Sequence, residues 1–274
     1  MGSEWQTLAF GSQTESLLWE LFHENTKLSR LSFRRSAQEV EKYVAGLLES
    51  LPFDGYPTVK LPKRLPPLTM SIEQAMRSRT SAREMRSGLV RMEQLAAILY
   101  YGYGITRHPA GGPRALRTVP SAGALYPLEV FVQVRHVDQL TPGIYHYNPL
   151  RHHLRNVREG DYTDELSRCL IQHSIPQNAS LFIFITALFE RSTFKYGDRG
   201  YRFVLLEAGH VAQNINIVCT GFRLGSLNVG GFFDRESDAF LQLDGITHSN
   251  IYMVAIGTNS KPGSKNGESI RIGD

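Results

Sequence analysis

The chain has 274 residues, of which 42% are hydrophobic and 20% charged, so we expect one large globular domain or two small ones and not a disordered chain. The formal charge is only +4 and the basic residues are scattered, which argues against a nucleic-acid-binding protein. No apolar run is long enough to span a membrane. Two cysteines, Cys169 and Cys219, stand in apolar helical stretches, as buried free thiols of a cytoplasmic protein would.

The first 66 residues predict a helical extension and a connector. Residues 14–25 and 36–50 have helical patterns, and Ser36 followed by Glu39 fits a capping box. The stretch "LPFDGYPTVKLPKRLPPL" that follows is rich in proline and is expected to be extended. We therefore interpret residues 1–66 as an N-terminal extension that ends in a Pro-rich connector.

Helices and strands mix in the remainder, up to a polar tail at 259–274. A capping box at Ser71 and Gln74 opens a short helix toward Arg77. Further helices are predicted over residues 91–101 and 161–172. Strands are predicted over residues 128–135, in a hairpin over 143–157, over 179–188, near 226–229 and over 249–257.

A long helix beginning near Tyr201 looks central to the fold. Its apolar positions are 201, 204, 205, 208, 211, 212, 215, 218, 219 and 222, a helical stripe sustained for about six turns. Phe203, Leu206 and Ile217 are apolar but lie off that stripe, so we expect a second subunit to cover part of the helix. Helices around a mostly buried sheet predict an α+β fold, with one domain over residues 67–258.

The stretch "RSRTSAREM" is a candidate phosphate site. In an extended segment, alternation places Arg79, Ser81 and Arg83 on one side, and two guanidiniums with a hydroxyl suit a phosphate group. The alternative is a solvated basic loop.

Two small-residue turns are candidates for contact with a flat ligand. Pro120, Ser121, Ala122 and Gly123 precede a buried strand, and Gly230 with Gly231 follows another. Small side chains allow a ligand to approach the main chain closely. The alternatives are an ordinary turn and a β-bulge.

Lys195 and Tyr196 sit on a glycine turn directly before the long helix. Burial beside a cofactor would lower the pKa of a lysine and permit base chemistry, whereas an exposed pair would have no role. Glu207, on the long helix, is interpreted as a polar position at a surface or interface. His152 and His153 lack further ligands, so no metal site is expected.

Several of these segments together resemble the nitroreductase superfamily, and more closely its SagB-type, McbC-like branch of thiazoline/oxazoline dehydrogenases. The resemblance covers most of residues 20–257 and is carried by "FHENTK", "RTSAR", "PSAGALYPLE", "KYGDRGYRFVLLEAGHVAQN", "GGFFD" and "IYMVAIG". It implies a nitroreductase-like α+β fold with a mostly antiparallel sheet, a homodimer and FMN at the subunit interface.

The resemblance also implies roles for individual residues. It places the FMN phosphate at Arg79, Ser81 and Arg83, and the flavin ring beside Pro120, Ser121, Ala122, Gly123, Gly230 and Gly231. It makes Lys195 and Tyr196 the catalytic pair, without saying which is base or acid. A further phosphate contact from Lys261, Lys265 or Arg271 in the tail is left open.

The function that the resemblance favours is FMN-dependent dehydrogenation of an azoline to an azole in peptide natural-product biosynthesis, with oxygen reoxidising the flavin. The substrate would be peptide-borne or carrier-bound, and a cyclodehydratase is an expected partner. One alternative is an NAD(P)H-dependent nitro or quinone reductase. Another is a flavin-bound scaffold that supports a partner enzyme. The sequence does not distinguish thiazoline from oxazoline.

Overall fold

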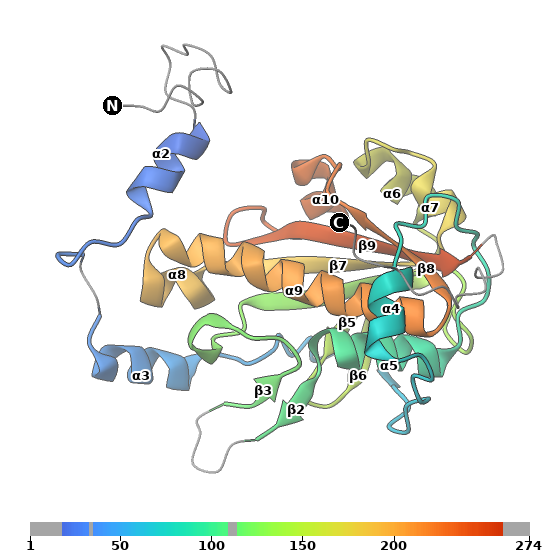
Figure 1. Ribbon diagram of the computed structural model, residues 1–274, viewed down its shortest axis with the longest axis horizontal. Helices are drawn as coiled ribbons and strands as arrows, with labels where there is room; N and C mark the ends of the chain where they lie inside the picture. The colour runs from blue at the N-terminus through green and yellow to red at the C-terminus, as the bar shows by residue number, and fades with distance from the viewer. Residues whose placement is uncertain (1–17, 33–34, 109–113, 260–274) are drawn as a thin grey trace, which may run out of the picture.

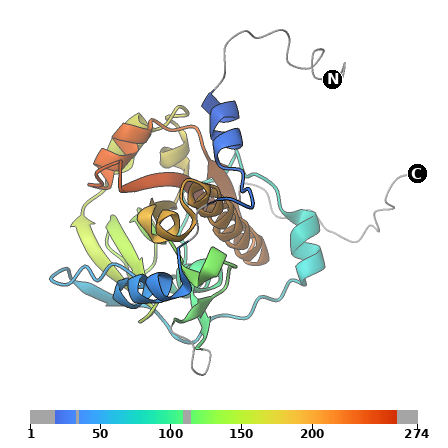
Figure 2. The same cartoon turned by 90° about the vertical axis from the view of Figure 1, so that its left-hand side faces the viewer.

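The computed structural model describes residues 18–32, 35–108 and 114–259. Within these ranges, seven strands form an antiparallel sheet in the order β1-β6-β5-β4-β7-β9-β8, and β2 pairs with β3 in a separate hairpin. Helices α5 and α9 cover one face of the sheet, while α6, α7 and α10 cover the other (Figure 1, Figure 2). The predicted α+β fold is confirmed.

The element bounds agree with most of the predicted ranges. The strands are β1 (Thr58–Lys60), β2 (Ile105–Arg107), β3 (Leu116–Arg117), β4 (Leu128–Val134), β5 (Gly143–Asn148), β6 (His153–Glu159), β7 (Leu181–Leu188), β8 (Leu224–Val229) and β9 (His248–Thr258). The helices are α2 (Leu18–Asn25), α3 (Ala37–Gly46), α4 (Ile72–Ser78), α5 (Met92–Tyr103), the 3-10 turn η1 (Ala122–Ala124), α6 (Thr163–Cys169), α7 (Ile175–Asn178), α8 (Glu190–Tyr196), α9 (Arg199–Gly221) and α10 (Asp234–Phe240).

The two faces of the sheet build two apolar cores. Along β7, Ile183 and Ile185 enter the core beneath α5 and α9, whereas Phe182 and Phe184 enter the core beneath α6 and α10. Side chains alternate between the faces of a strand, so a strand covered on both faces reads as one continuous apolar run. This explains the sequence "LFIFITAL" of β7.

Helix α9 is buried along one side and open along the other. Val204, Ala208, Val211 and Ala212 are buried, as the helical stripe predicts. Leu206, off the stripe, is 60% exposed. The described chain therefore leaves apolar surface on the central helix uncovered.

The N-terminal extension touches the body at a few places. Helix α2 stands away from the sheet (Figure 2), and its Phe22 meets Tyr201 at a ring-centroid distance of 5.6 Å. Tyr43 on α3 stacks on Phe194 of α8. The Pro-rich connector adds β1 to the edge of the main sheet by pairing with β6. The predicted capping boxes at Ser36 and Ser71 are both present.

Two local features differ from the sequence prediction, and some predicted features lie outside the described residues. Lys195 and Tyr196 end the short helix α8 instead of lying on a turn, and the turn follows at Gly197, whose φ is +57°. The helix expected over 161–172 is shorter, because α6 ends at Cys169. The start of the helix expected at 14–25, and the tail lysines and arginine, lie outside the described residues. No helix in the described ranges has the length and apolarity needed to cross a membrane.

Candidate functional site

The loop before β4 and the end of α8 meet at Gly123. Gly123 has a φ of +63°, and a Cβ added there would lie 2.8 Å from Lys195 Nζ and 2.7 Å from Tyr196 Oη. The ammonium of Lys195 also lies 5.2 Å from the centre of the Tyr196 ring. Two stretches of sequence about 70 residues apart are thus brought together. Any side chain at position 123 would compete with the ends of Lys195 and Tyr196.

A buried charge network fixes α8 to the sheet. Glu129 on β4 accepts hydrogen bonds from Arg191 on α8 (2.7 Å) and from the backbone N–H of Leu51 (3.0 Å). His146 on β5 lies 2.7 Å from its other oxygen. Burial acts to raise the pKa of Glu129, but His146 and Arg191 outweigh burial and hold that pKa at about 2. Glu129 is therefore ionised at neutral pH, and it anchors α8 one helical turn before Lys195.

A second buried carboxyl, Glu207 on α9, lies behind the same loop. It is 3% exposed and accepts a hydrogen bond from Tyr103 Oη at 2.7 Å. Burial raises the pKa of Glu207 to about 7, against the lowering effects of the Ser121 and Tyr103 hydroxyls and of the Arg117 charge. The interpretation of Glu207 as a surface or interface position is wrong.

The Arg79–Arg83 segment lies against β8, away from Gly123. The Ala82 N–H donates to the Ser226 carbonyl at 3.0 Å, and the Ala82 side chain packs against Gly225. Its neighbours Ser81 and Arg83 are exposed. Among the described residues, the guanidiniums of Arg79 and Arg83 form no ion pair. They are therefore available to an anion.

The glycine pair follows the end of β8. Gly230 is exposed, and the Gly231 carbonyl accepts a hydrogen bond from the N–H of Ile171 at 3.0 Å. Nearby on β8, the side-chain oxygen of Asn228 is buried and has no hydrogen-bond partner among the described residues. Phe233 is exposed at the start of α10.

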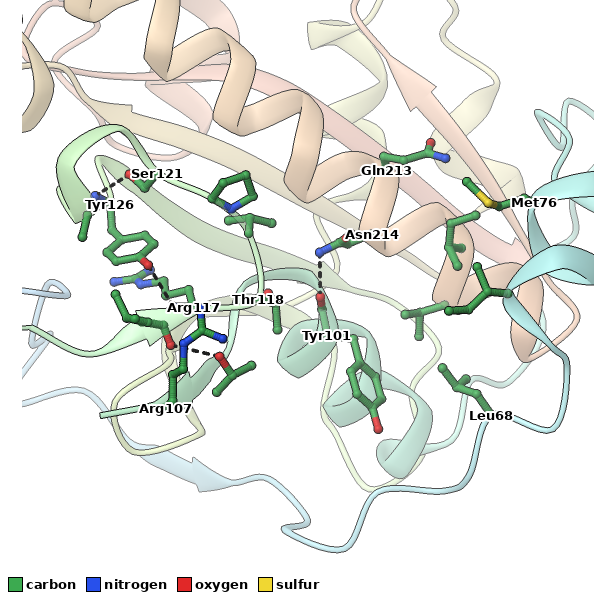
Figure 3. Close-up of a pocket in the computed structure, with 18 residues that line it drawn as sticks. Leu68, Met76, Tyr101, Arg107, Arg117, Thr118, Ser121, Tyr126, Gln213 and Asn214 are labelled. Atoms are coloured by element: carbon green, nitrogen blue, oxygen red, sulfur yellow. Dashed lines mark hydrogen bonds between the residues drawn. The ribbon is translucent and has the colours of Figure 1, made fainter. Parts of the chain in front are cut away.

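A cavity of about 930 Å³ opens beside the loop (Figure 3). Figure 3 shows Ser121 and Tyr126 on one side and Gln213 and Asn214 of α9 on another. Pro120 and Ser121 are the only predicted site residues that line this cavity in the described chain. The hydroxyl of Thr118, also in the lining, is buried without a hydrogen-bond partner.

Within one chain, the predicted site residues lie in groups at opposite ends of α9. Lys195 and Tyr196 precede the first residue of α9, whereas Ala82 contacts Gly225, just beyond its last residue. A helix of 23 residues is about 34 Å long at ~1.5 Å per residue. One chain therefore does not bring the expected phosphate residues to the catalytic pair.

The donor set fits a flavin nonetheless. Free guanidiniums suit its phosphate, and the unpartnered oxygens of Thr118 and Asn228 offer acceptors and a donor where the ring is expected. The exposed Gly230 leaves the main chain open to a planar ligand.

This fold and these residues define a known class of protein. The chain belongs to the family described as "Nitroreductase family", which its sequence matches over residues 76–258. A Methanocaldococcus jannaschii protein described as a nitroreductase, MJ1384, is 37% identical over 174 residues, which cover 64% of this chain and 85% of that protein. The microcin B17-processing protein McbC of Escherichia coli is 34% identical over 137 residues, 47% of this chain and 49% of McbC.

A solved structure extends the likeness. The E. coli microcin synthetase McbBCD complex with truncated pro-MccB17 contains a chain with a TM-score of 0.57 and 24% identity, covering 88% of this chain and 87% of that chain. At this identity the match shows a shared fold. By sequence, the chain spans only about half the length of McbC.

Sequence reasoning missed the residues that support the site. Glu207 lies three positions after Val204 and four before Val211, on the buried stripe of α9, and that spacing could have revealed it. Glu129 is, with Gln133, one of two polar residues in the fully buried strand β4, and it could have been found in the same way. Nothing in the local sequence identifies Arg191 as the partner of Glu129.

Proposed function

We propose that the chain is an FMN-dependent oxidoreductase that dehydrogenates a thiazoline or oxazoline to the azole in peptide natural-product biosynthesis, with oxygen as the final electron acceptor. The observation that carries the proposal is the convergence of Lys195 and Tyr196 on Gly123. A proton-transfer pair beside the loop expected to face the flavin suits a reaction that removes both a hydride and a proton. The likeness to McbC, a microcin B17-processing protein, supports the substrate class.

The bound flavin would accept the hydride from the azoline carbon. The chain would supply the rest: Arg79, Ser81 and Arg83 would hold the phosphate, and the loop at Gly123 with the Gly230 turn would position the ring. Lys195 would take the proton that the substrate loses, and Tyr196 would orient Lys195 or donate to the ring heteroatom. Two hydrogens leave the azoline, and oxygen receives them as hydrogen peroxide.

A two-fold homodimer would complete the site, because it pairs opposite ends of α9. Gly209 lies at the middle of α9 and is exposed, and among the described residues no atom outside its own stretch of helix lies within 4 Å of the position of an added Cβ. A second α9 could therefore cross closely at this glycine, over the exposed Leu205 and Leu206. Antiparallel crossing would bring the Lys195 end of one copy beside the Arg83 end of its partner.

Replacing Leu206 with arginine should therefore separate the dimer and release the flavin. Leu206 is exposed in the single chain, so the charge should leave the protomer folded but would be buried without a partner in the dimer, at a cost of several kcal/mol. Light scattering and flavin absorbance measure both effects. The matched control is Leu150→Arg, at an exposed leucine in the β5–β6 turn. A dimeric, yellow Leu206→Arg protein would contradict this interface.

The N-terminal extension supplies a surface for the proposed cyclodehydratase and its peptide. Helix α2 exposes Leu18, Trp19 and Leu21. Helix α3 contacts α8 through the stacked rings of Tyr43 and Phe194. Exposed apolar helices of this kind often mark protein contacts. The scaffold alternative would use the same surface without turnover.

The competing enzyme is an NAD(P)H-dependent nitro or quinone reductase, which the name and greater coverage of MJ1384 favour. The deciding experiment first identifies the released cofactor by mass spectrometry, where FMN is expected. The FMN-loaded protein is then mixed under nitrogen with an azoline peptide or with NADPH. Bleaching by the azoline, with formation of the azole, supports the proposal. Bleaching by NADPH alone supports the reductase, and bleaching by neither supports the scaffold.

A further inference from the structure

Helix α8 is too short to be stable without help from its surroundings. It has seven residues, and isolated helices shorter than about 12 residues are marginal in water. The buried ion pair of Arg191 with Glu129, at 2.7 Å, fixes its first turn. Lys195 and Tyr196 stand in its last turn, where a helix leaves carbonyl groups without partners of its own. The position of this pair therefore depends on what holds the last turn.

The N-terminal extension holds the last turn of α8 through Phe194. Arg35 Nε donates a hydrogen bond to the Phe194 carbonyl at 2.8 Å, and the Arg35 guanidinium lies 4.6 Å from the centre of the Phe194 ring. Tyr43 stacks on the same ring, with the ring centroids 3.4 Å apart and the planes at 12°. A cation bonded to a carbonyl at the C-terminal end of a helix also interacts favourably with the helix dipole. Arg35 thus caps α8 one residue before Lys195.

Other contacts of this turn act on side chains. The ring of Tyr196 meets Phe203 of α9 edge to face, with the centroids 4.9 Å apart. The ends of Lys195 and Tyr196 lie against Gly123. Arg35 differs from these neighbours because it bonds the backbone that carries the pair.

The extension reaches the same region at two further points. The N–H of Leu51 donates to Glu129 at 3.0 Å, and Arg199, the first residue of α9, donates to the carbonyl of Thr26 at 2.9 Å. Figure 1 shows α2, α3 and α8 at one end of the molecule. The match to the nitroreductase family begins only at residue 76, so these contacts come from outside the matched domain.

We propose that Arg35 and Tyr43 are positioning residues, which hold the last turn of α8 and thereby keep Lys195 and Tyr196 in place for proton transfer. The N-terminal extension is then a working part of the active site and not only a surface for partners. The effect on catalysis rests on the proposed function, but the hold on α8 is a property of the chain alone.

The first test follows hydrogen exchange in the flavin-free protein by mass spectrometry. Peptides covering residues 190–197 should exchange about 2–10-fold faster in Arg35→Ala and in Tyr43→Ala, because each variant loses one hydrogen bond or one ring contact. Peptides from the buried part of α9 should exchange as in wild type, which reports that the body stays folded. The controls are Arg30→Ala, at an exposed arginine of the same extension, and Tyr43→Phe, which keeps the stacked ring.

The second test measures the rate of flavin bleaching by an azoline in the FMN-loaded protein under nitrogen. Arg35→Ala and Tyr43→Ala should each lower this rate by up to about 10-fold, because the pair is correctly placed in fewer molecules. The dissociation constant of FMN should not change, and Tyr43→Phe should restore the rate. In a protein that already carries Lys195→Ala and Tyr196→Phe, Arg35→Ala should cause no further loss, because the groups that it positions are absent.

The outcomes separate the two proposals. Wild-type exchange of α8 in both alanine variants would overturn the inference, and so would faster exchange with an unchanged rate. A rate loss from Arg35→Ala that persists in the protein lacking both functional groups would also overturn it, because Arg35 would then act elsewhere. No bleaching of the wild-type protein by an azoline would overturn the proposed function, and the exchange measurement would still decide the hold on α8.

Discussion

Replacing Lys195 with alanine is expected to abolish most azole formation while leaving the fold and the flavin in place. Lys195 reaches Gly123 from α8 and is proposed to take the substrate proton, so its loss should lower the rate about 10²–10⁴-fold, equivalent to about 3–5 kcal/mol of transition-state stabilisation. The measurement is the single-turnover rate of flavin bleaching by an azoline under nitrogen. A wild-type rate with flavin fully bound would make Lys195 a surface lysine.

Gly123→Ala perturbs the same contact without removing either functional group. The added Cβ would occupy the space of Lys195 Nζ and Tyr196 Oη, and both flexible ends would have to move. Gly55→Ala is the control, since Gly55 also has a positive φ, +96°, but no other described atom lies within 4 Å of a Cβ added there. Both variants bear backbone strain from the positive φ. A lower rate of flavin bleaching in Gly123→Ala than in Gly55→Ala would therefore report the steric effect on Lys195 and Tyr196.

Tyr196→Phe assigns the roles within the pair. Its effect should be small if Tyr196 only orients Lys195, and comparable with that of Lys195→Ala if Tyr196 is the acid. If the two residues act as one unit, the double variant should be hardly slower than the slower single variant. Additive losses would show that they act independently.

Replacing Glu129 with alanine should destabilise the protein by about 3–5 kcal/mol, because Arg191 would stay buried without its counter-charge. Thermal unfolding should show this as a fall of roughly 10 °C in Tm for a chain of this size. The surface control is Asp54→Ala, which removes an 80% exposed carboxylate paired with Arg155 and should cost about 0–1 kcal/mol. Equal losses in the two variants would contradict the proposed anchor.

The pH dependence of this loss has a defined sign. The pKa of Glu129 is about 2, below its ordinary value, so its ionised form stabilises the fold above about pH 4.5. That contribution disappears as the pH falls through 2, and the gap between wild type and Glu129→Ala should close over this window. The double variant Glu129→Leu, Arg191→Met should recover part of the stability at neutral pH, since it removes both charges of the Glu129–Arg191 ion pair together.

Local patterns in the sequence were sufficient for the main elements. The apolar stripe of α9 and the apolar run of β7 each predict which faces are buried, and the structure buries those faces. The capping boxes of α3 and α4 could be predicted from the sequence, because each involves only four consecutive residues.

The contacts that hold the candidate site in place could not be predicted from the sequence, because they join residues that are far apart along the chain. Arg191 and Glu129 are 62 residues apart, and the Tyr103 bond to Glu207 spans 104 residues. The family resemblance therefore implied a catalytic role for Lys195 and Tyr196, which stays a prediction, but not that α8 carries them or that Gly123 is their neighbour. The roles assigned to the flavin-facing residues stay predictions.

The strand order has a consequence for how the protein is made. β9 follows β8 along the chain, yet it lies between β7 and β8 in the sheet, so among the described strands β8 pairs with β9 alone. A nascent chain that has not yet released residue 258 from the ribosome can hold β8 against α9 but cannot pair it.

The early Arg79–Arg83 segment depends on the same event. Ala82 is bonded to Ser226 of β8, and Arg86 exchanges backbone hydrogen bonds with Thr258 of β9. These contacts link residues more than 140 positions apart, and such closures come late because of their entropy. The proposed phosphate-binding segment should therefore acquire its place only after synthesis of β9, and a nascent chain would have nothing there to hold a cofactor before that point.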